Sequence, residues 1–284
     1  MTTTAAVTTT STATTTVLPP GRLNLPRWGE LWHAREVAFR MAQRDILVRY
    51  RQTVLGVGWV VIQPLMSAGV FTLVFGKVAG FQGGVKIPFF LFSLAGSLVW
   101  TVFSGTLTRA AAAMVGNQSL VSKVYFPRLL VPLSTVASVL LDFAVGLVLA
   151  IGLLFYWRIN PGWPVLLVPV WALLAAMLGL GVGVAASALM VKYRDVGYVL
   201  PWVTQVLLYA SPVAYPLSSV PASVRVLFDI NPATWFLEAF RWSLTGMEAP
   251  PAWQMIGLAV GAPLVLLLGV LWFQRYEREF ADVI

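Results

Sequence analysis

Asp142 is the residue of this sequence with the clearest potential for chemistry in an apolar setting. It is the only charged residue between positions 129 and 157, a stretch otherwise rich in Leu, Val and Ala. An ionisable side chain in such a stretch is costly and by default marks a function. Three roles are open to it: a proton-coupling group, a hydrogen-bonded residue of helix packing, or a carboxyl that burial keeps neutral. We expect no basic residue at matching depth, which argues against a proton relay.

The patterns of common catalytic and metal sites are absent from the sequence. The chain has no cysteine and a single histidine, His33, which argues against thiolate and histidine clusters. Gly76-Lys77 is followed by Val78, so the phosphate-binding loop G-x-x-x-x-G-K-[ST] does not occur. The acidic residues are scattered and form no pair that would hold magnesium or act as acid and base. The sequence therefore predicts no catalytic residue, no metal site and no cofactor bound by this chain.

The elements that position these residues must be membrane helices, because the composition excludes an ordinary soluble domain. Of 284 residues, 58% are hydrophobic and 11% are charged, and the mean hydropathy is +0.81. An average soluble domain has about 25% charged residues. About 20 apolar residues in a helix cross the hydrocarbon core. We expect an all-α integral membrane fold whose domain over residues 52–284 has six spans, at 58–76, 88–108, 130–155, 164–190, 198–215 and 255–273.

Basic residues predict the orientation of the spans. With six crossings, 14 of the 19 Lys and Arg residues fall on the side of both termini. Positive charge gathers on the cytoplasmic side of membrane proteins, so both termini are expected in the cytoplasm. The net charge of +8 is mainly a topology signal, and its dispersal over several loops argues against nucleic-acid binding. Residues 1–25 begin with ten threonines in sixteen positions and are expected to form a disordered tail.

Residues 26–51 are expected to form an amphipathic helix at the cytoplasmic membrane surface. Tryptophans flanked by arginines suit a helix that lies in the interface and attracts anionic headgroups. A helix packed on the bundle outside the membrane is the alternative. The apolar residues that share one arc of about 100° in a helical projection are Trp28, Leu31, Trp32, Phe39, Ala42 and Ile46, and Arg40, Arg44 and Arg51 project from the far side.

The segment 117–128 predicts a short cytoplasmic helix after the second span. Asn117 is a favourable first residue for a helix, and Pro127 cannot continue one. Apolar side chains on a cytoplasmic loop indicate either a docking site for a partner or burial in the membrane surface. The side chains expected to be exposed there are Leu120, Val124, Tyr125 and Phe126.

The fifth span and the segment after it are unusual. Pro201 and Pro212 interrupt the span and Pro216 closes it, which is typical of a helix that lines a cavity or moves. Two short helices are expected next, the first from Pro221 to about Phe228. The second begins with Asn231 as its cap and Pro232, ends at Gly246, and is apolar enough to suggest a re-entrant hairpin in the outer leaflet.

Aromatic residues make up 13% of the chain, and most are expected in the belts at the two membrane surfaces. Four lie on the outer halves of the second and fifth spans, where flat rings could stack on the faces of sugar rings and line a path for a glycan. Anchoring toward lipid is the alternative for each of them. These residues are Trp100, Phe103, Tyr209 and Tyr215.

Several motifs in order resemble one family of transporters. The run from Arg44 to Gly56, followed by Trp59 and Gln63-Pro64-Leu65, is similar to the start of type-2 ABC exporter permeases of bacterial polysaccharides. Later landmarks follow in the family's order from about Trp28 to the C-terminus: Lys123-Val124-Tyr125-Phe126-Pro127-Arg128, Leu141-Asp142-Phe143, Tyr193-Arg194-Asp195, Ser211-Pro212-Val213-Ala214-Tyr215, Asn231-Pro232 and Phe240-Arg241-Trp242.

The resemblance implies a homodimer in the bacterial cytoplasmic (inner) membrane, paired with two copies of a separate ABC ATPase that binds ATP and Mg²⁺. It implies export of a lipid-linked polysaccharide, an O-antigen-like glycan on undecaprenyl diphosphate, as a step of lipopolysaccharide biosynthesis. Teichoic acid, a drug or a small lipid are alternative cargoes. A secondary transporter or a membrane enzyme is disfavoured, since internal repeats, coupling charges and acidic clusters are missing.

The resemblance also assigns roles to individual residues. The residues of an ATPase-coupling helix would be Gln118, Leu120, Val121, Lys123, Val124, Tyr125, Phe126 and Arg128. The residues near the lipid diphosphate would be Arg40, Arg44, Arg49 and Arg51, since arginine suits phosphate. Outer gate helices would contain Asn231, Pro232, Trp235, Glu238 and Arg241.

Overall fold

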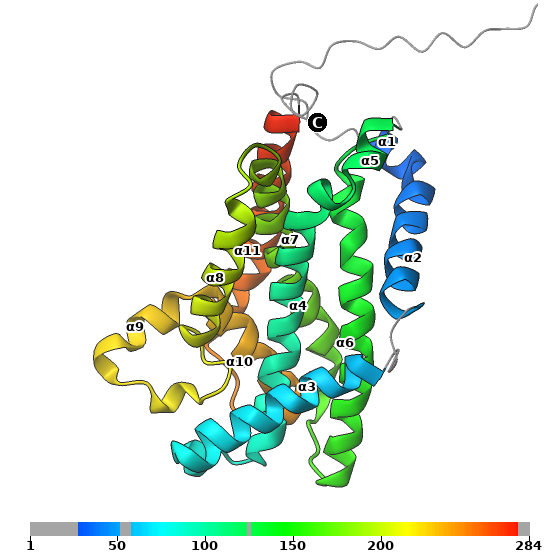
Figure 1. The fold of residues 1–284 in the computed structure, drawn as a ribbon. Helices are drawn as coiled ribbons and strands as arrows, with labels where there is room; N and C mark the ends of the chain where they lie inside the picture. The colour runs from blue at the N-terminus through cyan, green and yellow to red at the C-terminus, as the bar shows by residue number, and fades with distance from the viewer. Residues whose placement is uncertain (1–27, 52–57, 124–125, 278–284) are drawn as a thin grey trace, which may run out of the picture.

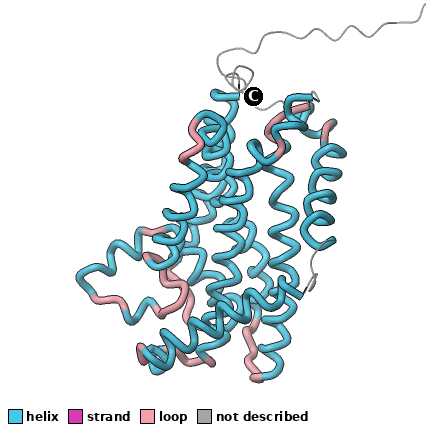
Figure 2. The backbone as a smooth tube through the Cα atoms, viewed as in Figure 1, coloured by secondary structure: helices cyan, strands magenta, loops and turns pink. Residues whose placement is uncertain are grey.

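The computed structural model describes residues 28–51, 58–123 and 126–277, and every regular element in these ranges is helical (Figures 1 and 2). This confirms the expected all-α class. The longer helices are α2 (Arg35–Arg51), α3 (Gly58–Phe71), α4 (Phe89–Gly116), α6 (Leu130–Tyr156), α7 (Val168–Lys192), α8 (Val196–Tyr209), α10 (Pro232–Thr245) and α11 (Ala252–Tyr276). The shorter ones are α1 (Trp28–His33), η1 (Thr72–Val78), η2 (Phe81–Gly84), α5 (Gln118–Lys123), η3 (Trp163–Leu167), η4 (Leu217–Ser219) and α9 (Ala222–Ile230).

The centre of the bundle is formed by α4, α7 and α11, which pack closely because glycines line α7. A Cβ atom added to Gly183 would come within 2.7 Å of the Leu107 carbonyl oxygen on α4. One added to Gly181 would come within 2.6 Å of the Val265 carbonyl oxygen on α11. Small residues allow this approach of backbones, and van der Waals packing then holds membrane helices together.

A second apolar core lies at the end of the bundle that carries α1, α5 and the C-terminal turn of α11, here called the α5 end (Figure 1). It joins Met41 of α2, Met114 of α4 and Val121 of α5 with Phe126 and with Phe273 of α11. Figure 1 shows α2 running alongside α6, and the two helices are in contact. The opposite half of the bundle holds α10 and is called the α10 end.

Five helical segments are long and apolar enough to cross a membrane: Gly58–Val78, Phe89–Gly116, Leu130–Tyr156, Trp163–Lys192 and Ala252–Tyr276. They correspond to five of the six expected spans. The remaining one, expected at 198–215, is helical only as α8, which ends at Tyr209. Fourteen residues rise about 21 Å, less than the hydrocarbon core of about 30 Å. A sixth crossing therefore remains a prediction.

The second span is longer than expected, because α4 continues from the expected end at Thr108 to Gly116. The expected end of the span lies before Arg109, the first charged residue after the apolar run. The helix continues past Arg109 because its side chain pairs with Asp142. This residue is therefore part of the membrane helix in the structure, not of a loop.

The segment expected to be one amphipathic helix consists of α1 and α2, which meet at Ala34. Met41 and Ala42 of α2 are buried against the bundle, whereas Trp32 and Phe39 are exposed. Packing along α6 accounts for the buried residues of α2. A position in the membrane interface stays a prediction.

The two short helices expected before the last span are present as α9 and α10. The Asn231 side chain accepts a hydrogen bond from the backbone N–H of Ala233 at 2.9 Å, Pro232 is the first residue of α10, and Gly246 ends it with φ 71°. This local chemistry is confirmed. Helix α10 is packed against α4, α7 and α11, and Phe236, Leu237 and Phe240 on it are fully buried.

Candidate functional site

A polar groove of about 600 Å³ lies between α3, α4 and α6. Helix α3 crosses α4 and α6 obliquely and forms one wall (Figure 1). At the depth of membrane helices such a groove is unusual, because lipid-facing surfaces are apolar and polar side chains turn toward protein or water. The polar members of its lining are Gln63 and Ser67 of α3, Thr101, Thr108 and Arg109 of α4, and Asp142 of α6, beside the rings of Trp59 and Phe143.

An ion pair forms the charged centre of this groove. The Nη2 group of Arg109 donates to Asp142 Oδ2 at 2.8 Å, and its Nη1 group donates to Ser138 Oγ at 2.7 Å. The two charged side chains are 27% and 11% exposed. The expectation that no basic residue lies at the depth of Asp142 is therefore wrong. The long Arg109 side chain on the extended α4 supplies the partner, and the pair leaves the groove without net charge.

Two of the four aromatic residues assigned to a glycan path do not line an open surface. Trp100 and Phe103 are buried, and Phe103 packs on Phe236 of α10 with ring centroids 5.4 Å apart. Their burial follows from the insertion of α10 beside α4, which the sequence pattern did not indicate. Tyr209 is exposed at the end of α8, and the Tyr215 hydroxyl donates to its carbonyl oxygen at 2.7 Å.

The break after α8 is held by a buried arginine at the α10 end. Arg241 is fully buried and donates through Nη1 to the Pro212 carbonyl oxygen at 2.6 Å and through Nη2 to that of Val213 at 2.5 Å. Its Nη1 also reaches Glu238 Oε1 at 3.0 Å, and its guanidinium lies 3.8 Å from the centroid of the Phe92 ring. Arg241 thus satisfies carbonyl groups that the interrupted helix leaves unpaired.

The remaining residues assigned to an outer gate lie around the same cluster. Trp235 Nε1 donates to the Asp229 carbonyl oxygen at 2.6 Å, and its ring packs on Trp253 with centroids 5.6 Å apart. The Asn231 amide donates to Ser211 Oγ at 3.0 Å, so it joins the start of α10 to the break.

The segment assigned to ATPase coupling has both exposed and buried residues. Gln118 and Lys123 of α5 are exposed, and Leu120 is half-buried. Val121 and Phe126 are buried in the core of the α5 end, so the expected exposure of Phe126 is wrong. The chain turns there into α6, which carries the ring inward. Val124 and Tyr125 lie outside the described residues.

Two further features mark the α5 end. Arg128 donates through Nη1 to the Glu277 carbonyl oxygen at 3.1 Å, which links the start of α6 to the end of α11. A pocket of about 250 Å³ between the ends of α4, α5 and α7 is lined by Met114, Val115, Gln118, Met190, Val191, Lys192 and Arg194. Its basic residues and its place beside α5 suit an acidic surface.

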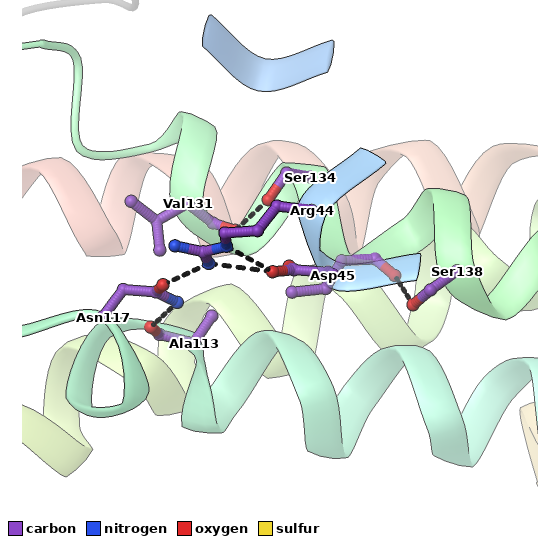
Figure 3. Close-up of polar contacts among 8 residues, drawn as sticks. Arg44, Asp45, Ala113, Asn117, Val131, Ser134 and Ser138 are labelled. Atoms are coloured by element: carbon purple, nitrogen blue, oxygen red, sulfur yellow. Dashed lines mark hydrogen bonds and ion pairs between the residues drawn. The ribbon is translucent and has the colours of Figure 1, made fainter. Parts of the chain in front are cut away.

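The arginines of α2 differ in their surroundings. Arg40 is exposed and lies 3.8 Å from Glu36 Oε1. Arg44 donates to Asp45 Oδ1 and to Asn117 Oδ1 at the start of α5 (Figure 3). Arg49 and Arg51 are at the end of α2, and their side chains lie outside the described part of the structure.

A row of hydroxyl residues on α4 was missed by sequence reasoning. Ser97, Thr101, Ser104 and Thr108 follow one another at intervals of three or four residues, so they share one face of the helix. The hydroxyls of the last three donate to the carbonyl oxygen four residues earlier, at 2.8 to 2.9 Å. Thr101 and Thr108 of this row line the groove, so the spacing is a signal that would have located part of its polar wall.

Known proteins similar to this chain cover most of its length. Residues 37–245 match the ABC-2 type transporter family. The O-antigen export system permease protein RfbA of Myxococcus xanthus is 28% identical over 257 residues, which cover 90% of this chain and 98% of that protein. A protein of the same name from Klebsiella pneumoniae is 24% identical, covering 86% and 93%. The polysialic acid transport protein KpsM of Escherichia coli is 24% identical, covering 83% and 91%.

Proposed function

Because this chain belongs to the ABC-2 type transporter family, we propose that it is the membrane subunit of an ATP-driven exporter of polysaccharide. The observation that carries the proposal is the similarity to an O-antigen export permease along 90% of the chain. A polysialic acid transport protein among the relatives supports long glycans as the common cargo. In this proposal the chain is the permease, and a separate subunit would hydrolyse ATP.

The groove between α3, α4 and α6 is the proposed contact surface for the glycan. Its wall combines an ion pair without net charge with hydroxyl and amide groups, which suit the many hydroxyls of an uncharged sugar unit. Trp59 adds a ring that is 48% exposed and able to stack on a sugar face. These residues replace Trp100 and Phe103 in the proposed path, and Tyr209 remains part of it.

The proposed partners are a second copy of this chain and two copies of an ABC ATPase, which would bind ATP and Mg²⁺. Helix α8 has no buried residue, and α3 buries only Val60 and Ala68. Two apolar helices with so little cover suit a symmetric interface. The ATPase would dock on α5 and the basic pocket beside it, so in this proposal the α5 end would face the cytoplasm.

The lipid carrier of the glycan is proposed to be a polyprenyl diphosphate in the bacterial inner membrane. Arg40 is exposed on α2, and with Arg49 and Arg51 it would attract the diphosphate at the cytoplasmic surface. The interrupted α8 with the segment up to Tyr215 would complete a sixth crossing, and α10 would dip into the outer leaflet.

The test is reconstitution of this chain with its ABC ATPase in vesicles that contain lipid-linked O-antigen-like glycan. We expect glycan to accumulate on the far side only when ATP and Mg²⁺ are supplied. Vesicles that contain this chain without the ATPase serve as the control and should export nothing. Matched vesicles that contain teichoic acid, a drug or a small lipid test the alternative cargoes, and export of one of these without export of the glycan would show that the proposed cargo is wrong.

A further inference from the structure

We propose that Arg44 and Asn117 are positioning residues that make α2 follow the movement of α5. The proposal rests on the proposed function, since it takes α5 to be the helix that the ATPase moves. Arg44 comes from the segment before the first span, and Asn117 lies 73 residues later at the end of α4. Their contact joins two elements that the chain itself connects only through the first two spans.

The geometry of the contact fixes the direction of the Arg44 side chain. Its Nη2 group donates to Asn117 Oδ1 at 2.5 Å and to Asp45 Oδ1 at 2.8 Å, and its Nε group donates to the same Asp45 oxygen at 3.1 Å. Figure 3 shows Arg44 between Asp45 and Asn117, with α6 beside it. The neighbouring carboxylate orients the guanidinium toward Asn117, although the Arg44 side chain is 46% exposed.

Asn117 is rigidly tied to the first turn of α5. Its carbonyl oxygen accepts from the N–H groups of Leu120 and Val121, both at 3.0 Å. Its side-chain Nδ2 donates to the Ala113 carbonyl oxygen at 2.9 Å, which fixes the amide so that Oδ1 faces Arg44. Ala113 lies in the last turn of α4, so the atom that Arg44 holds sits at the joint between α4 and α5, and a displacement of this joint displaces it.

Apolar packing supports the same connection. Met41 of α2, Met114 of α4 and Val121 of α5 belong to one buried cluster at the α5 end. Close-packed side chains transmit displacement, because they leave no free volume to absorb it. Apolar packing alone allows α2 to slide along its neighbours. The hydrogen bond between Arg44 and Asn117 fixes the position of α2 relative to the start of α5. If the contact only anchored α2, its loss would lower stability without changing how ATP hydrolysis is used.

The first experiment measures glycan exported per ATP hydrolysed in vesicles that hold the complete complex. Arg44→Met or Asn117→Leu should lower this ratio about fivefold while ATP hydrolysis continues, as expected for the loss of one charge-assisted hydrogen bond. The double variant should be no worse than either single one, because both remove the same contact. Arg44→Lys keeps a donor and should lose less.

Gln43→Ala, at an exposed neighbouring position on α2, is the matched control and should leave the ratio unchanged. Additive effects of the two substitutions would overturn the proposal. An unchanged ratio of glycan exported to ATP hydrolysed in the single variants would also overturn it, including the case in which export and hydrolysis fall in parallel.

The second experiment measures the distance between the two helices and needs no glycan. The chain has no cysteine, so spin labels on Gln43→Cys and Ser119→Cys in one copy of the proposed dimer, beside an unlabelled second copy, report the distance within that copy. We expect one narrow distance distribution that persists when ATP binds to the complex, and a broad one after Asn117→Leu. An equally narrow distribution in that variant would overturn the link. A wild-type complex that hydrolyses ATP but exports no glycan would instead contradict the proposed function.

Discussion

Arg109 and Arg241 carry their charges into the apolar part of the molecule, and each is compensated in a different way. Arg109 faces a carboxylate on another helix, whereas Arg241 is bound mainly to the carbonyl oxygens of Pro212 and Val213. Replacing both members of a buried ion pair by apolar residues is often tolerated, while removal of one member leaves an uncompensated charge. The backbone partners of Arg241 cannot be substituted away, so a second substitution at its one carboxylate partner in the described structure, Glu238, compensates only part of the loss of Arg241.

This difference gives a prediction for the charged centre of the groove. Asp142→Leu should destabilise the protein by about 2 to 3 kcal/mol, because the Arg109 guanidinium is left with Ser138 alone at membrane depth. The double variant Arg109→Met with Asp142→Leu should regain most of that loss. Thermal unfolding of the purified protein in detergent measures both. A single variant as stable as the wild type would contradict the role assigned to the ion pair.

Glu277, just beyond the end of α11, gives a prediction about pH. Burial raises the pKa of this carboxyl above its ordinary value of 4.5, although Arg128 beside it acts in the opposite direction. A raised pKa means that the folded protein binds the proton more tightly than the unfolded chain, so stability falls as the pH rises above about 4.5. Glu277→Gln should therefore raise Tm at neutral pH and have little effect near pH 4.

Comparison of Tm for Glu277→Gln and the wild type at both pH values is the measurement. Glu248 provides a contrast, since its exposed carboxylate is paired with Lys86 at 2.9 Å and the hydrogen bond lowers its pKa. Glu248→Gln should show no gain at neutral pH. A gain of equal size at both pH values for Glu277→Gln would show that the charge of Glu277 is not its cause.

At the scale of single residues, the sequence was sufficient where the chemistry is local. Asn231, Pro232 and Gly246 could be assigned to the start and end of α10 because caps depend on neighbouring residues in the chain. The partner of Asp142 could not be assigned. It depends on how far α4 extends and on which face of α6 it meets, and both are tertiary properties.

Among the elements, α7 is the one on which the others converge, and its glycines set how closely they approach. Gly183→Ala should destabilise the protein by about 1 to 3 kcal/mol, because the new Cβ would lie 2.7 Å from the Leu107 carbonyl oxygen. Gly261→Ala on α11 is the matched control, since nothing lies within 4 Å of a Cβ there. Unfolding of both variants in detergent tests the prediction, and equal stability of the two would contradict it.

The elements whose ends depend on tertiary contacts were predicted less well than those with local signals. Pro212 lies in the irregular segment after α8, but the expectation that Pro201 interrupts a helix is wrong, because α8 continues through it. The sequence pattern also did not indicate that α8 would stop at Tyr209 with Arg241 holding the chain beyond it. The residues next to Phe126 in the sequence indicate an exposed loop, so they wrongly predict that its side chain is exposed. Phe126 is buried in a core to which α2, α4, α7 and α11 contribute, and these helices lie beside it only in the fold.

At the scale of the whole molecule, α3 and α8 have large exposed apolar faces, which motivates the prediction of a symmetric dimer. Because the chain lacks cysteine, Val199→Cys on α8 should form a cross-linked dimer on mild oxidation in the membrane. Val148→Cys, at a more exposed position on α6, should not, because helix α6 lies on the opposite side of the bundle from α8 (Figure 1). Gel mobility without reducing agent distinguishes the outcomes, and cross-linking of the α6 position alone would place the interface elsewhere.

Composition alone was enough for the class of the molecule, because 58% hydrophobic residues cannot be hidden in one soluble core. Five of the six expected spans have a corresponding long helix. The sequence alone did not predict which helices pack against one another. The closest packing joins α7 to α4 and to α11, and this choice depends on glycines whose facing partners lie far away in the chain.

That packing order has a consequence for biosynthesis. The glycine-lined centre needs α11, which begins only at Ala252, so a nascent chain leaves the ribosome with α4 and α7 already inserted but one flank of α7 uncovered. A chain that stops before residue 252 lacks the surface that covers Gly181 and never completes its centre. We therefore expect a copy truncated before residue 252 to expose one flank of α7 and to be cleaved more readily than the full chain.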